Sequence, residues 1–117
     1  MKALPFFIAT ALAGSVAPAM AHAFLERADP VAGANLTAAP TRIELHFTEP
    51  LEPAFSAVKV TDENGNDVGA GPPSVGGSEM DLALKALAPG RYRVSWHAVS
   101  VDTHRTEGKY NFLVLPP

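Results

Sequence analysis

The sequence predicts an all-β domain, built as an antiparallel sandwich or a small Greek-key barrel. Apolar and polar residues alternate in several short runs, which is the pattern of strands with one buried face. Stretches rich in glycine and proline separate these runs and are typical of turns. No segment carries a sustained apolar stripe with the 3.6-residue period of a helix. Several short strands in a chain of this length favour two packed sheets.

The first half of the predicted domain contains two strands and a turn. Residues 42–47 alternate strictly between polar and apolar side chains, and residues 55–62 form a second strand with two valines on one face. Asn64-Gly65 follows as a hairpin-type turn, because such turns need residues that tolerate positive φ. Residues 69–78 are rich in glycine and proline, which predicts a loop within the domain.

The second half contains three more predicted strands, each marked by three alternating apolar residues. These residues are Met80, Leu82 and Leu84, then Tyr92, Val94 and Trp96, and finally Tyr110, Phe112 and Val114. The run 87–92 places a Pro-Gly turn just before a tyrosine, as at the corner between the sheets of immunoglobulin-like domains. There the tyrosine hydroxyl bonds back to the turn. We therefore expect Tyr92 and Trp96 to belong to the core.

The amino-terminal region has the composition of an export signal. Lys2 gives it a positive start, residues 3–14 are mostly apolar, and small residues follow as far as Ala21. The apolar stretch is too short to span a bilayer and contains a proline, so no membrane insertion is expected. Residues 1–21 are therefore predicted to be a signal peptide, which implies an exported protein.

The predicted cleavage after Ala21 leaves a single domain, residues 22–117, that begins with His22. Cleavage after Ala19 or after Ala23 would also satisfy the small-x-small pattern and would remove this histidine from the terminus. An intact-mass measurement of the secreted protein distinguishes these alternatives.

The composition excludes several classes of function. The net charge is −3, so no basic surface is available to neutralise nucleic-acid phosphates. There is no cysteine, so the domain has no disulfides and cannot form blue-copper, zinc-finger or iron–sulfur sites, which need thiolates.

Two separated segments carry candidate metal ligands. A terminal His22 would offer its α-amine and its imidazole to one ion, and Asp102-Thr103-His104 offers a carboxylate and a second imidazole. Three nitrogens and one oxygen suit Cu(II) in a tetragonal arrangement. The alternative interpretation of residues 102–104 is a solvated turn in which the aspartate bonds its own backbone.

Four segments stand out together: His22-Ala23-Phe24-Leu25, Asp29-Pro30 with Gly33-Ala34, Leu45-His46-Phe47-Thr48-Glu49-Pro50, and Trp96-His97-Ala98-Val99-Ser100-Val101-Asp102-Thr103-His104. Combined with the Pro-Gly-x-Tyr corner, they resemble the CopC family of periplasmic copper-resistance proteins over essentially all of residues 22–117. The resemblance implies a Greek-key β-barrel or cupredoxin-like sandwich.

The resemblance also implies a Cu(II) site. His22 matches the family's amino-terminal ligand, His104 the second imidazole and Asp102 the carboxylate near the metal. Glu49 matches an acidic residue beside the site, where it would bond a water or the terminal amine. Family members that also bind Cu(I) use a methionine-rich loop. Here only Met80 remains after cleavage, in a predicted strand, so no such Cu(I) site is expected.

The expected function is therefore periplasmic Cu(II) binding for copper sequestration, trafficking or resistance, without catalysis. The family suggests an inner-membrane copper transporter of the CopD type as partner. One alternative is a copper-dependent oxidative enzyme with a histidine-brace centre, although Asp102 would crowd the position that oxygen needs. The other is a metal-free immunoglobulin-like interaction module. His46 and His97 lie on polar faces of their strands, and a contribution to the metal site is left open for both.

Overall fold

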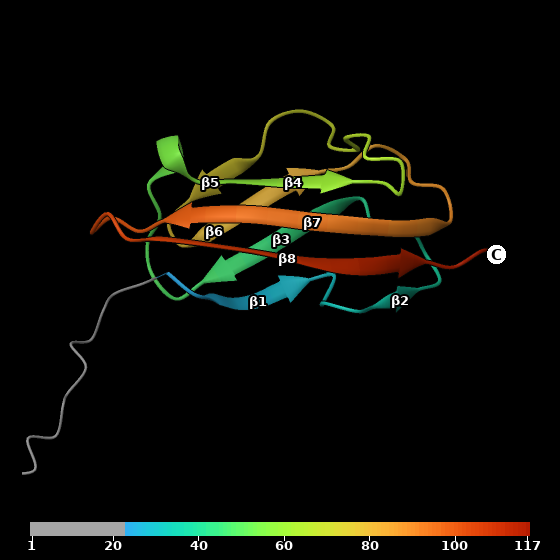
Figure 1. Ribbon diagram of the computed structural model, residues 1–117, viewed down its shortest axis with the longest axis horizontal. Helices are drawn as coiled ribbons and strands as arrows, with labels where there is room; N and C mark the ends of the chain where they lie inside the picture. Colours follow the sequence, from blue (N-terminus) through green and yellow to red (C-terminus); the bar gives the residue numbers. More distant parts are fainter. Residues whose placement is uncertain (1–22) are drawn as a thin grey trace, which may run out of the picture.

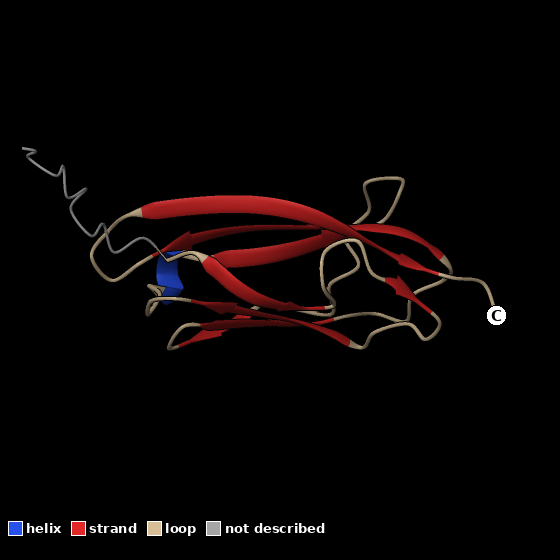
Figure 2. Cartoon of the chain, turned by 90° about the horizontal axis from the view of Figure 1, so that it is seen from below, coloured by secondary structure: helices blue, strands red, loops and turns tan. Residues whose placement is uncertain are grey.

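The computed structural model describes residues 23–117, which form a sandwich of two stacked sheets (Figures 1 and 2). Each sheet has four strands. The first has the order β1 (Leu25–Asp29), β3 (Arg42–Phe47), β6 (Glu79–Ala83), β5 (Ser74–Gly76). The second has the order β2 (Asn35–Leu36), β8 (Arg105–Val114), β7 (Gly90–Val99), β4 (Ala57–Thr61). All neighbours pair antiparallel except β2 and β8, which are parallel. The predicted all-β sandwich is confirmed.

The strands with strict alternation lie where the sequence predicts them. β3 covers 42–47, and β7 and β8 carry their predicted apolar triplets, whereas β6 contains Met80 and Leu82 but ends at Ala83, one residue before Leu84. β4 begins later than expected because residues 53–55 form a short 3₁₀ helix, η1 (Pro53–Phe55). The Asn64-Gly65 turn is confirmed: Gly65 has φ +82° and donates its N–H to the Asp62 carbonyl at 3.0 Å.

Three strands escape the sequence-based prediction. The predicted loop 69–78 contains β5, a three-residue edge strand, so that prediction is wrong at 74–76. β1 and β2 are also unpredicted. In β1 a bulge between Leu25 and Arg27 breaks the alternation, and β2 has only two residues. The shared cause is that these strands are short or irregular and depend on a neighbour for their shape.

The core lies between the two sheets. Tyr92 is buried, stacks on Phe112 with ring centroids 5.4 Å apart, and donates its hydroxyl to the Ala88 carbonyl at 2.6 Å. The predicted tyrosine corner is thus confirmed. Trp96 is half-buried and packs edge-to-face against Phe47 at 5.0 Å, so it borders the core instead of lying inside it. Met80 is fully buried, as its alternation predicts.

Several loops meet at one end of the sandwich, at the left of Figure 1. The start of β1, η1 and the turn between β7 and β8 all lie there. Within residues 23–117 no helix has the length and apolar character required to cross a membrane.

Candidate metal centre

The beginning of the described chain is fixed to both sheets. Ala23 is fully buried, and its carbonyl accepts a hydrogen bond of 2.6 Å from the Thr106 hydroxyl in β8. Phe24 donates its N–H to Thr48 Oγ1 at 3.0 Å and accepts the Thr48 N–H at 2.9 Å, directly after β3. The segment therefore closes the end of the sandwich at which the β7–β8 turn lies (Figure 1).

The β7–β8 turn holds the two described candidate ligands. Ser100 donates its N–H to the His104 carbonyl at 2.9 Å, and Thr103 donates its N–H to the Ser100 carbonyl at 2.8 Å. Thr103 adopts φ +74°, an uncommon conformation for a β-branched residue. Such backbone strain is concentrated at functional sites. This tight turn keeps Asp102 and His104 close together at the end of the molecule.

Asp102 and His104 contact each other within the turn. His104 Nδ1 lies 3.4 Å from Asp102 Oδ1. The two side chains are 42% and 39% exposed, although His104 Nδ1 itself is shielded from solvent. The Ser100 hydroxyl donates a hydrogen bond to the Asp102 carboxylate. That bond is the main reason why the pKa of Asp102 lies below its usual value, and His104 contributes in the same direction. The segment is a turn, as the alternative interpretation expected, and the Asp102 carboxylate bonds the backbone of His104 as well as contacting the side chains of Ser100 and His104.

The other two predicted site residues are Glu49 and His22. Glu49 is half-buried between Thr48, which pairs with Phe24, and Pro50, whose carbonyl accepts the Val101 N–H at 3.2 Å. The backbone on either side of Glu49 thus joins the amino-terminal segment and the β7–β8 turn. His22 lies outside the described residues.

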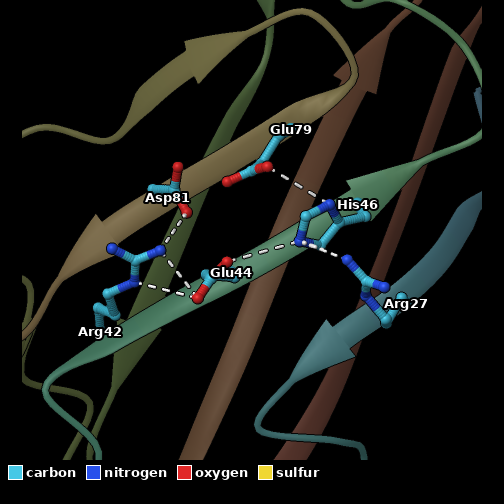
Figure 3. Close-up of polar contacts among 6 residues, drawn as sticks. All are labelled: Arg27, Arg42, Glu44, His46, Glu79 and Asp81. Carbon is cyan, nitrogen blue, oxygen red and sulfur yellow. Dashed lines mark hydrogen bonds and ion pairs between the residues drawn. The ribbon is translucent and has the colours of Figure 1, made fainter.

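A separate ligand cluster, Glu44, His46 and Glu79, lies on the outer face of the β1-β3-β6-β5 sheet (Figure 3). His46 Nε2 is 3.5 Å from Glu44 Oε1, and His46 Nδ1 is 3.4 Å from Glu79 Oε1. Arg27 Nη2 approaches His46 Nε2 at 3.3 Å. Among residues 23–117 this is the one group of three or more His, Cys, Asp or Glu side chains close enough to hold an ion.

Sequence reasoning missed this cluster. It placed His46 on the polar face of its strand beside Glu44, and both positions are confirmed. The third member, Glu79, lies opposite His46 on β6, a pairing that only the register reveals. His97 belongs to the other sheet, on β7 opposite Ala57 and Glu107.

Neighbouring charged groups shift the pKa values of both carboxyl groups in the cluster. The Arg42 guanidinium hydrogen-bonds Glu44 and lowers the pKa of that carboxyl. The pKa of Glu79 is raised, first by the adjacent carboxyl of Asp81 and then by partial burial. The β6 side of the cluster thus places the carboxyl groups of Glu79 and Asp81 next to each other.

Comparison with known proteins identifies the family. The CopC domain model matches residues 25–115. Protein YobA of Escherichia coli K12 is 36% identical over 118 residues, which cover 97% of this chain and 95% of YobA. Copper resistance protein C of E. coli is 35% identical over 106 residues, or 82% of this chain and 83% of that protein. The crystal structure of CopC from Methylosinus trichosporium OB3b superposes with a TM-score of 0.75 at 35% identity, covering 81% of this chain and 95% of that one. The chain therefore belongs to the CopC family, whose members bind and traffic copper and are not enzymes.

Proposed function

We propose that this protein is exported to the periplasm, loses residues 1–21 and binds one Cu(II) for copper sequestration, trafficking or resistance. The ligands are the amine and imidazole of His22, the imidazole of His104 and the carboxylate of Asp102. This donor set matches the tetragonal N,O preference of Cu(II). Family membership favours copper handling over an oxidative enzyme or a metal-free interaction module.

The observation that carries the proposal is the hydrogen bond between Ala23 and Thr106. Residue 22 is covalently attached to Ala23, so its Cα lies about 3.8 Å from that of Ala23. Thr106 is two residues beyond His104, a separation of about 7 Å along an extended strand. The hydrogen bond beside the β7–β8 turn therefore supports an amino-terminal ligand at position 22.

Glu49 and Met80 define the rest of the proposed chemistry. Glu49 supports the site from beside it, by accepting a hydrogen bond from the terminal amine or from a bound water. A carboxylate nearby favours the dipositive ion. Met80 is fully buried in the core, so its thioether is not available as a soft ligand for Cu(I).

Copper titration of the mature protein tests this proposal. We expect one Cu(II) per chain with a nitrogen-rich axial EPR spectrum, and an affinity that falls between roughly pH 8 and 6 because the amine and imidazoles must lose protons to bind. His104→Ala should lower the affinity and remove one nitrogen from the spectrum. His97→Ala, the same change on the other half of the β7–β8 hairpin, should leave both unchanged. Equal spectra for the two variants would contradict the ligand assignment.

The hydrogen bond between Thr106 and Ala23 gives a second prediction. Thr106→Val keeps the shape of the side chain but removes the hydrogen bond to Ala23, so the amino-terminal segment should be held less firmly. The expected cost is about 1 kcal/mol, or roughly fivefold in Cu(II) affinity, with an unchanged EPR spectrum. Competition against a chelator of known affinity measures this effect. An altered spectrum would mean that Thr106 affects the ligands themselves.

The copper partner is proposed to be an inner-membrane transporter of the CopD type, as the family resemblance suggests. Three large apolar side chains support docking at the copper end. Phe24, Phe55 and Val101 are all more than half exposed and belong to the segments gathered at that end of the sandwich. Exposed apolar groups around a polar site are typical of a protein interaction surface.

A further inference from the structure

The Glu44–His46–Glu79 cluster lies in the other sheet from His104 and has no role in the proposed copper site. All three side chains are half-buried, with exposed fractions of 24–35%. They come from two adjacent strands, and Figure 3 shows both carboxylates directed toward the imidazole. A side chain held by a rigid sheet needs little reorganisation to bind an ion.

The donor chemistry fits a divalent cation of the zinc type. One imidazole and two carboxylates are common zinc ligands, with bonds of about 2.0–2.2 Å. Two ligands of a tetrahedral ion are then about 3.4 Å apart, and His46 Nδ1 lies 3.4 Å from Glu79 Oε1. Glu44 faces the other ring nitrogen, and its side chain must rotate to join the same ion. The ligand atoms of the three residues lie within 4.8 Å of one another.

The carboxylates in and around the cluster outnumber the guanidinium groups beside it. Three carboxylates, those of Glu44, Glu79 and Asp81, and two guanidinium groups, those of Arg27 and Arg42, lie together here (Figure 3). Arg42 pairs with Glu44 and Asp81, and Arg27 contacts His46. Asp81 Oδ1 is inaccessible to solvent and accepts no hydrogen bond from residues 23–117. It forms an ion pair with Arg42 at 3.7 Å. A dication beside Glu79 would bring positive charge to this side of the cluster.

We propose that Glu44, His46 and Glu79 form a second metal site, which binds a divalent cation such as Zn²⁺ independently of the copper site. Arg27 donates to the opposite ring nitrogen, Nε2, and so favours the tautomer that carries the proton on Nδ1; it therefore competes with an ion bound at Nδ1. The site is weaker than the copper site for this reason. The inference does not rest on the proposed function, since it uses none of the copper ligands.

Zinc titration of the folded protein tests the second site. In a His104→Ala background, which weakens zinc binding at the copper site, we expect Zn²⁺ to shift the NMR resonances of the His46 ring. His46→Gln identifies those resonances. Glu79→Gln keeps the size of the side chain and should weaken this zinc binding by about tenfold or more. Glu107→Gln, an exposed glutamate on β8, is the matched control and should have no effect.

A variant that binds zinc more tightly distinguishes loss of the site from loss of folding. Arg27→Gln removes the competing guanidinium and should strengthen zinc binding severalfold, which a misfolded protein cannot do. The proposal is overturned if Zn²⁺ leaves the His46 ring unshifted, or if Glu79→Gln and Arg27→Gln both bind zinc as the parent does. Loss of Cu(II) binding in His104→Ala with zinc binding retained would separate the two sites.

Discussion

Acetylation of the α-amine of His22 is expected to lower the Cu(II) affinity of the mature protein by about a hundredfold or more. The acetyl group removes one of four proposed donors and destroys the chelate ring formed with the imidazole of the same residue. Loss even of a residue that only supports a ligand costs about 10–100-fold in metal affinity, and loss of a ligand should cost at least as much. Chelator competition on semisynthetic protein, with and without the acetyl group, measures the change.

The control for acetylation is its combination with His104→Ala. If the amine and His104 bind the same ion, the two changes should not add, because either one already disrupts the site. Additive losses would indicate separate copper sites. A Cu(II) affinity that survives acetylation would disprove the amino-terminal ligand.

Phe112→Ala is expected to destabilise the fold by about 3–5 kcal/mol. Phe112 is 1% exposed on β8 and stacks on Tyr92, the residue that closes the corner between the sheets. Removing its ring leaves a cavity between the sheets that the rigid strands fill only in part. Urea unfolding followed by the fluorescence of Trp96, the single tryptophan of the chain, measures the free energy of unfolding.

Phe55→Ala is the matched control for this effect. It deletes the same ring from η1, where the side chain is 63% exposed, and should change the free energy of unfolding by no more than about 0.5 kcal/mol. A similar cost for both substitutions would mean that burial in the sandwich does not govern stability here.

The sequence predicts best those strands in which buried and exposed residues alternate along the chain. In β3 polar and apolar residues alternate without a break, so residues 42–47 alone predict both its bounds and the face that packs on the core. β1 is different. Its bulge places Leu25 and Ala28 against the core three positions apart, a spacing that resembles no simple strand. The bulge forms through pairing with β3, which no local pattern reveals.

The same distinction applies to the two candidate metal sites. Asp102 and His104 are recognisable because they are two residues apart in one turn. Their closeness to the amino terminus depends on a bond between residues 83 positions apart, which the chain's composition cannot indicate. His46 and Glu79 meet only through the register of β3 with β6. Long-range pairing was therefore the missing information in each case.

The burial of Ala23 has a consequence for the timing of copper capture. Under the proposed function, residues 1–21 of the unprocessed precursor are joined to His22 by an ordinary peptide bond. An amide nitrogen stands there in place of a basic amine. Newly synthesised precursor therefore lacks the free α-amine and cannot bind copper tightly inside the cell. Cleavage by signal peptidase creates that ligand.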